Sequence, residues 1–177
     1  SPDQDVVMDE VFADESPVWI IGGGKTGMDT AYALLRRDPD REVNLVAGSG
    51  TWFLDRDRMF PSGTRRWWGG RLNGAVWLEA GQRFDGTNED EVWDWFRSRY
   101  GIWVTPRTGN CFFAYLSEAE RDTIRDGLTE VVMDHLVDVV DGADGGVELV
   151  LRGGGRHPVA AGSWVVNTTG YLHRELP

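Results

Sequence analysis

The sequence has one cysteine, few basic residues and no long apolar run. The single cysteine, Cys111, excludes a disulfide within the chain, which is typical of a reducing compartment such as the cytoplasm. No apolar run approaches the roughly 18 residues of a membrane span, and no signal peptide is evident. With 29 acidic residues against 18 basic ones, the formal net charge of −11 argues against nucleic-acid or anionic-membrane binding. We therefore expect a cytoplasmic protein with no nucleic-acid or membrane partner.

The sequence also lacks the side-chain patterns of metal sites and catalytic triads. His135, His157 and His173 are scattered, without Cys or Asp partners at ligand spacing, so we predict no metal site. No Ser, His and Asp spacing supports a triad. Cys111 lies among apolar residues, which favours a buried, inert thiol over a reactive one. We name no catalytic residue from the sequence.

At 177 residues, the length favours one domain with a sizeable core. Residues 1–16 form an acidic leading segment, whose apolar residues Val6, Val7, Met8, Val11 and Phe12 can dock on the domain. Residues 17–177 form the domain itself. Because the chain starts at Ser1 rather than Met, we expect it to be part of a longer protein.

What the sequence does contain is a glycine-rich turn between a short apolar run, Val18–Ile21, and a helix-forming segment, Thr26–Arg37. Gly22, Gly24 and Gly27 give the spacing G-x-G-x-x-G, and strand, turn and helix are the context that a dinucleotide-binding fingerprint requires.

Each glycine of this fingerprint has a physical role. Gly22 allows a tight exit from the strand, Gly24 lets backbone N–H groups approach a pyrophosphate, and Gly27 lets helix and strand pack closely. The helix N-terminus then faces the phosphates. The predicted cofactor-binding residues of the turn are Gly22, Gly23, Gly24, Lys25, Thr26 and Gly27.

Two other interpretations of this turn stay open. The turn can be glycine-rich without binding a ligand. Gly24-Lys25-Thr26 also resembles the end of a P-loop, but that motif needs a glycine where Trp19 stands, and the loop is too short for a triphosphate.

A second strand, Glu42–Ala47, completes a right-handed βαβ unit. An NAD or FAD site usually has an acidic residue at the end of this strand, and here Val46 to Gly50 contain none, which favours NADP. The candidates for holding the 2′-phosphate are Lys25, Ser49, Arg56 and Arg58. The alternative for the arginines is a solvated surface position.

Residues 51–130 break the alternating pattern and are interpreted as a Trp-rich helical insertion. Helices are predicted over Glu89–Tyr100, with Asn88 as N-cap, and over Glu118–Leu128, with Ser117 as N-cap and Glu120 in a capping box. The aromatic residues can line a substrate pocket, but they more often fill a small core or pack on a partner domain. A stacking patch for nucleic acid at residues 65–68 is disfavoured by the acidic chain.

The rest of the chain returns to β character. A strand region at 130–140, a turn at 141–146 and an alternating strand at 147–151 indicate a β-hairpin. A second turn covers 152–155, and a last short buried strand covers Trp164–Asn167. The predicted fold class is α/β: a Rossmann-like three-layer domain with a parallel sheet, an antiparallel β-hairpin crossover and a helical insertion.

Two segments together resemble a known family. Residues 20–29 are similar to the second glycine fingerprint of flavin-dependent monooxygenases and related flavoproteins with two dinucleotide-binding domains. Residues 165–171 are similar to the (V)(V)xATGY segment that ends the same domain, with Thr168 in place of Ala. The resemblance covers roughly residues 17–48 and 131–172.

The resemblance implies an NADP(H)-binding domain that lies against an FAD domain and delivers hydride to the flavin. It places the segment Thr168-Thr169-Gly170-Tyr171 near the junction of the two domains, with Thr169 and Gly170 among the cofactor-binding residues. No FAD fingerprint occurs here, so the FAD domain is expected outside these residues, and the chain alone is not expected to be active.

One departure from the family pattern is compatible with a second function. The arginine that usually follows the second strand of the NADP site is absent. The alternative is a non-catalytic dinucleotide-binding or protein-interaction module with a degenerate Rossmann half.

Overall fold

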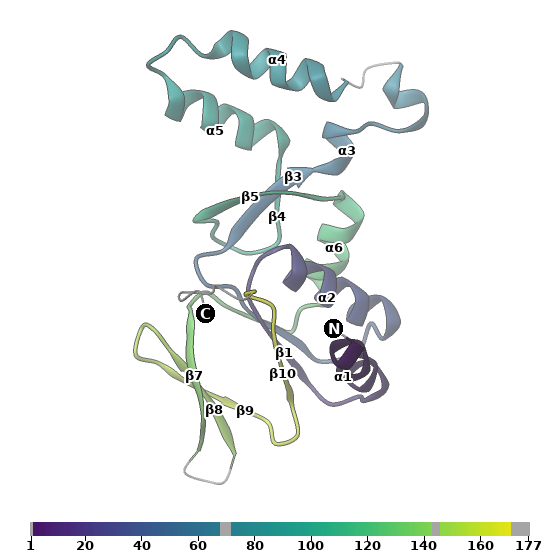
Figure 1. The fold of residues 1–177 in the computed structure, drawn as a ribbon, viewed down its shortest axis with the longest axis vertical. Helices are drawn as coiled ribbons and strands as arrows, with labels where there is room; N and C mark the ends of the chain where they lie inside the picture. Colours follow the sequence, from purple (N-terminus) through teal and green to yellow (C-terminus); the bar gives the residue numbers. More distant parts are fainter. Residues whose placement is uncertain (1, 68–71, 143–145, 171–177) are drawn as a thin grey trace.

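A computed structural model describes residues 2–67, 72–142 and 146–170. Trp68, Tyr171 and His173, which were considered in the sequence, lie outside the described residues. The molecule is elongated: two of its three sheets pack against each other towards one end, and the third lies further along the long axis (Figure 1). The helices α4 (Asn73–Arg83) and α5 (Glu89–Tyr100) lie at the opposite end of that axis.

A parallel four-stranded sheet forms the centre of the fold. Its strands are β1 (Val18–Ile21), β2 (Val43–Val46), β6 (Glu130–Val132) and β10 (Trp164–Asn167). Their spatial order is β10-β1-β2-β6, with every neighbouring pair parallel. Counted from the β6 edge and numbered in chain order, this is 3-2-1-4, the arrangement of a dinucleotide-binding half, so the predicted Rossmann-like α/β fold is confirmed.

Residues of β1 alternate between two hydrophobic cores. Val18 and Ile20 pack with α2 (Lys25–Arg37) in one core. Trp19 and Ile21 pack on the other side against Leu149 and other residues of an antiparallel sheet. The strand is buried on both faces, as the continuous apolar run predicts.

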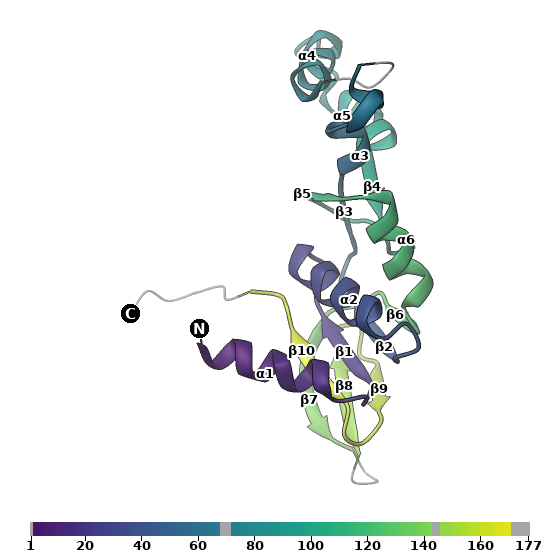
Figure 2. The same cartoon turned by 90° about the vertical axis from the view of Figure 1, so that its right-hand side faces the viewer.

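The antiparallel sheet contains three strands: β7 (Leu136–Asp141), β8 (Val147–Leu151) and β9 (Arg156–Val159). The predicted hairpin is therefore confirmed, with β9 as an additional strand. This sheet makes the connection from β6 to β10 and covers the face of the parallel sheet opposite α2 (Figure 2).

The prediction that β10 is buried is wrong. All four of its residues are partly or fully exposed, because β10 lies at the edge of the sheet and pairs with β1 alone among the described strands.

The segment between β2 and β6 is helical, as predicted, and also contains a three-stranded sheet that the sequence pattern did not indicate. Its strands, in the order β4-β3-β5, are β3 (Thr51–Asp55), β4 (Gly101–Trp103) and β5 (Asn110–Leu116). The short helices α3 (Arg56–Met59) and η1 (Gly63–Arg66) follow β3. All five residues of β3 are buried, so no apolar–polar alternation marks it as a strand.

Helix α6 (Glu118–Gly127) leads back from β5 to the parallel sheet. The Ser117 hydroxyl accepts a hydrogen bond from the Glu120 N–H at 3.1 Å, and the Glu120 carboxylate accepts from the Ser117 N–H at 2.6 Å, which confirms the predicted capping box. Ile124 packs in the core shared with α2. Helix α6 thus occupies the place of the second crossover helix.

The predicted N-cap residue of α5, Asn88, is confirmed, but it makes no side-chain hydrogen bond to the helix. Its Oδ1 instead accepts from the Asp85 N–H at 3.0 Å, and its Nδ2 donates to the Arg83 carbonyl at 3.0 Å. The Asn88 side chain therefore bonds the preceding loop rather than the first turn of the helix.

The acidic leading segment forms a helix, α1 (Pro2–Ala13), that the sequence did not predict. Val11 is fully buried in the main core, and Phe12 packs against it, so the expected docking is confirmed. Arg41 holds the end of this segment: its guanidinium donates to the Val11 carbonyl at 2.6 Å and to the Ser16 carbonyl at 2.9 and 3.1 Å.

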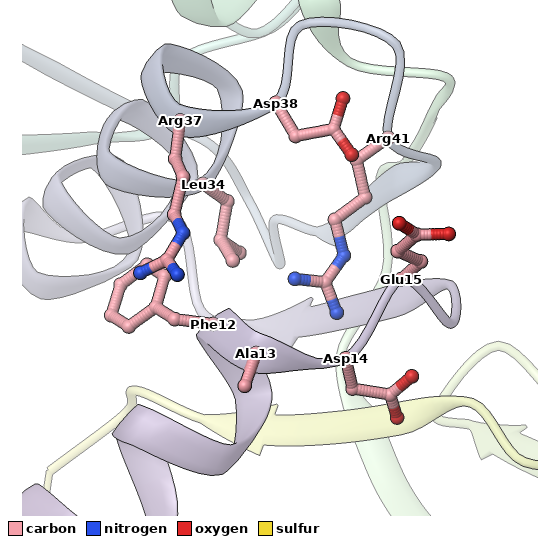
Figure 3. A pocket seen from close by; sticks show the side chains of 8 residues that line it. All are labelled: Phe12, Ala13, Asp14, Glu15, Leu34, Arg37, Asp38 and Arg41. Atoms are coloured by element: carbon pink, nitrogen blue, oxygen red, sulfur yellow. The ribbon is translucent and has the colours of Figure 1, made fainter.

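Arg41 lies in a cavity of about 220 Å³ between α1, the end of α2 and the turn that follows it (Figure 3). Asp14 and Glu15 line the same cavity. Burial lowers the pKa of the Arg41 guanidinium, although the nearby Asp14 and Asp38 carboxylates oppose the shift. Because its donors are used by carbonyls of the chain, this arginine is structural.

Candidate dinucleotide-binding site

The glycine turn follows β1 directly and packs tightly against two neighbours. Gly22 has a φ of +119°, and a Cβ there would lie 2.9 Å from the Thr168 hydroxyl. A Cβ on Gly27 would collide with the Gly22 carbonyl oxygen. A larger residue at Gly27 would push α2 away from the end of β1, and one at Gly22 would be strained by the positive φ and would crowd the end of β10, so both glycines are required by the fold itself.

Gly24 differs from these two glycines because it faces open space. No atom lies within 4 Å of the position that its Cβ would occupy, and its backbone, with φ −82° and ψ −175°, is accessible to any residue. The fold therefore does not need a glycine here, whereas a ligand approaching the backbone does.

The N-terminus of α2 is open to an anion. Gly24 is the N-cap and provides no side-chain hydrogen bond, and the first turn contains no acidic residue. Unpaired N–H groups and the positive end of the helix dipole thus lie beside the open space at Gly24.

The end of β10 lies against the glycine turn. The Thr168 N–H donates to the Ile21 carbonyl at 2.9 Å, and its hydroxyl donates to the same carbonyl at 2.8 Å. Asn167 Oδ1 accepts from both the N–H and the hydroxyl of Thr169, at 3.0 and 2.7 Å. The structure thus brings Thr169 and Gly170 to the carboxyl end of β1, although Thr168, not predicted as a site residue, makes the direct contact.

The carboxyl ends of β2 and β6 form a second part of the site. A cavity of about 420 Å³ lies there, and its lining residues are Gly48, Ser49, Arg107, Thr108, Gly109, Met133, Asp134 and His135. The Ser49 hydroxyl lies 3.3 Å from His135 Nε2. A Cβ on Gly23 would lie 2.9 Å from the Ala47 carbonyl oxygen, so the glycine turn and this strand end adjoin.

Asp134 is the acidic residue of this cavity, and it follows β6 rather than β2. Its carboxylate accepts from the His135 N–H at 2.7 Å and from the Gly153 N–H at 3.0 Å. These two hydrogen bonds lower the pKa of Asp134, so the side chain is ionised at neutral pH and its oxygens are held by the backbone.

Of the four candidates for the 2′-phosphate, only Ser49 lies in this cavity. Lys25 forms an ion pair with Asp29 one turn along α2. Arg56 pairs with Glu120 at 3.0 Å. Since a strand advances about 3.3 Å per residue, the five-residue β3 separates Arg56 from the Ser49 turn by roughly 16 Å.

The fourth candidate, Arg58, is held at the same far end of β3. Its side chain contacts Asp55 at 3.1 Å and donates to the Arg99 carbonyl at 2.8 Å. The structure therefore separates both arginine candidates from the glycine turn.

Arg107 is the cation that the structure places in the cavity, and sequence reasoning missed it. It comes from the loop between β4 and β5, and its Nη2 donates to the Met133 carbonyl at 3.1 Å. No local motif marks this residue, because its position depends on how the insertion folds back on β2.

Other functional chemistry is sparse in the part of the chain that the structure describes. No three His, Cys, Asp or Glu side chains there lie close enough together to hold a metal ion. Burial raises the pKa of the half-buried Cys111 thiol, which makes it less reactive. Over residues 2–67, 72–142 and 146–170, no helix is both long enough and apolar enough to cross a membrane.

Comparisons with known proteins give one structural similarity to report. No family model matches the chain, and no curated protein matches it. Among solved structures, the chain is similar to part of L-lysine 6-monooxygenase from Pseudomonas syringae, with a TM-score of 0.40 and 18% sequence identity. The match covers 89% of this chain and 36% of that protein, so the chain spans little more than a third of its length.

Proposed function

We propose that this chain is the NADP(H)-binding domain of a flavin-dependent oxidoreductase of the monooxygenase type. In this proposal it orients NADPH for hydride transfer to FAD, which is bound by a separate domain of the same protein. The substrate is a small molecule that binds outside the site described above.

One observation carries the proposal: the glycine turn lies at the switch point of the parallel sheet. The chain leaves β1 to pair β2 on one side and later returns to pair β10 on the other, so the direction of the strand order reverses at β1. Ligands of open α/β sheets bind at this point, outside the carboxyl ends of the strands. The open Gly24, the uncapped start of α2 and the Thr169–Gly170 segment all lie at this end of β1.

The residues present fit a dinucleotide pyrophosphate. The backbone N–H groups at the start of α2 would hold the phosphate oxygens, and the absence of a side chain at Gly24 leaves room for them. NADPH itself supplies the hydride when bound, while the chain binds and orients it. The resemblance of residues 20–29 and 165–171 to the NADP(H) domain of flavin-dependent monooxygenases supports the same assignment.

Thermal melting of the intact protein with NADPH, NADH and FAD tests this function. Ligand binding to the folded state raises the melting temperature, by an amount that grows with ligand concentration. Gly24→Val should abolish the rise with NADPH, because the valine side chain fills the space that the pyrophosphate needs. If none of the nucleotides changes the melting temperature of the unaltered protein, the proposal is wrong.

Gly81→Val is the matched control for this variant. Gly81 also faces open space, but it lies in α4, far from the glycine turn. This variant should keep the full response to NADPH. Loss of the response in both variants would assign the effect to stability rather than to the site.

A non-catalytic protein-interaction module is the second candidate, and exposed aromatic rings favour it. Trp77, Trp93 and Phe113 are between 40% and 62% exposed and lie on the insertion. Purification of the intact protein separates the candidates, since a bound flavin gives a yellow protein with visible absorbance.

A further inference from the structure

We infer that Arg107, with Ser49 and His135, binds the adenosine 2′-phosphate and makes the site select NADP(H) over NAD(H). The inference rests on the proposed function and deepens it. It assigns the selecting cation to the insertion rather than to the βαβ unit that carries the glycine fingerprint.

The loop that carries Arg107 is fixed against the end of β2. The Gly109 N–H donates to the Ser49 carbonyl at 2.8 Å, and the Asn110 N–H donates to the Gly50 carbonyl at 3.1 Å. Gly50 has a φ of +75°, and a Cβ there would collide with the Arg107 carbonyl oxygen. Arg107 therefore has a defined position beside the strand end at which dinucleotide sites read the ribose.

The Arg107 guanidinium retains donors for a phosphate. It is solvent-exposed, and the one hydrogen bond found for it, among the residues described, uses Nη2 and the Met133 carbonyl. None of the ion pairs of the described residues includes Arg107, whereas Lys25, Arg56 and Arg58 each have an acidic partner. A guanidinium has five N–H donors, and its planar fork matches a phosphate.

Ser49 and His135 line the same cavity from two other elements. Ser49 follows β2, and His135 follows β6, with 3.3 Å between the hydroxyl and the Nε2 atom. Both side chains can donate a hydrogen bond to a phosphate oxygen. A volume of about 420 Å³ lies within the range of small-ligand sites and leaves room for a phosphorylated ribose.

The charges at this strand end fit a phosphate better than a free ribose diol. No acidic residue follows β2 to accept hydrogen bonds from two ribose hydroxyls. Asp134, the acid of the cavity, already accepts from two backbone N–H groups. The groups left to recognise a ligand are thus the Arg107 cation and the hydrogen-bond donors of Ser49 and His135.

Titrations of the intact protein with NADPH and with NADH test this assignment. Arg107→Gln removes the charge and shortens the side chain but keeps a neutral N–H donor. We expect at least about a tenfold loss of NADPH affinity, since a charge-assisted hydrogen bond is lost, and an unchanged NADH affinity. Ser49→Asp adds the missing acid and should weaken NADPH binding while NADH binding is kept or strengthened.

Arg56→Gln is the matched control and should leave both affinities unchanged. The melting temperature of each variant without nucleotide shows that it is folded. An unaltered ratio of NADPH to NADH affinity in Arg107→Gln would overturn the assignment while leaving the proposed function standing. Binding of neither nucleotide by the unaltered protein would overturn the proposed function and this inference with it.

Discussion

The core on the parallel sheet and the core at the far end of the insertion are built from different side chains. The first is mostly aliphatic, with Ile20 and Leu45 fully buried, and it also takes in Phe53 from the sheet of the insertion. The insertion packs Trp52, Phe96 and Tyr100 between its sheet and the helices α4 and α5, and leaves further rings partly exposed. Other elements pack on both faces of the parallel sheet, whereas the second core lies within the insertion, at one end of the molecule.

This difference suggests a division of roles. A closed aliphatic core holds the glycine turn in one geometry, which a dinucleotide site needs. The insertion also carries a loop, 104–109, that reaches back to the end of β2. Stability should therefore depend mainly on the first region, and cofactor selection partly on the second.

The largest effect is expected from truncation in the parallel sheet. Leu45→Ala removes a fully buried side chain and should lower the free energy of unfolding by about 3–4 kcal/mol. Leu78→Ala is the matched control on α4, where the side chain is 62% exposed, and it should change stability by less than about 0.5 kcal/mol. Urea unfolding measures both, and equal losses would contradict the comparison.

A somewhat smaller loss is expected from the arginine that holds the leading helix. Arg41→Ala leaves the Val11 and Ser16 carbonyls without their donor and should cost about 2–3 kcal/mol. Amide hydrogen exchange in α1 should accelerate with it. Arg37→Ala, in the same cavity but exposed, should cost less than about 1 kcal/mol, and an equal cost for the two variants would contradict the assigned role.

Truncation of the aromatic layer should cost less than either. Trp93 contacts Trp52 and Phe113 with ring centroids 5.2 and 6.3 Å apart, but it is 40% exposed. We expect Trp93→Ala to lower the free energy of unfolding by about 1–2 kcal/mol, with an unchanged NADPH affinity. A loss as large as that of Leu45→Ala would show that the insertion is not the weaker region.

The smallest effects are two pH dependences of opposite sign. Hydrogen bonds from Ser16 and Trp164 lower the pKa of Asp14 below 3.8, so its stabilising contribution is present above that pH and is lost as the pH falls further. Burial raises the pKa of Asp55, although the Arg58 and Asp57 N–H groups oppose it. Its contribution to stability therefore decreases as the pH rises from 3.8 through the raised value.

Asp14→Asn and Asp55→Asn separate these two contributions. Asn retains the ability of Asp55 to cap α3, so the second variant tests the charge alone. Urea unfolding between pH 3 and pH 7 measures the free energy of unfolding of both variants. Asp14→Asn should lose less stability than the unaltered protein as the pH falls. Asp55→Asn should lose less stability than the unaltered protein as the pH rises. Identical pH profiles for both variants and the unaltered protein would contradict both assignments.

Features formed by residues that are close together in the sequence were predicted better than features formed by distant segments. The strand, glycine turn and helix at residues 18–37 are contiguous in the sequence, so the fold of this region was predicted closely. The Ser117–Glu120 capping box was equally local. The β3–β5 sheet was missed because its pairing joins distant segments and β3 is buried on both faces.

Residues of the candidate site that are distant in the sequence were also missed. The 2′-phosphate candidates were sought near the second strand in the sequence, and Ser49 is there. Arg56 and Arg58 are also near in sequence, but β3 carries them to its far end, where acidic residues pair with them. Arg107 is distant in the sequence and adjacent in space.

The sequence alone determined the βαβ unit, the glycine spacing and the lack of an acid after the second strand, because these depend on residues within a few positions of one another. The tertiary structure decided which strand lies at the sheet edge, which arginines are held by acids and which cation lies beside Ser49. Those outcomes depend on how the insertion packs back on the parallel sheet, and packing between distant segments has no local signal.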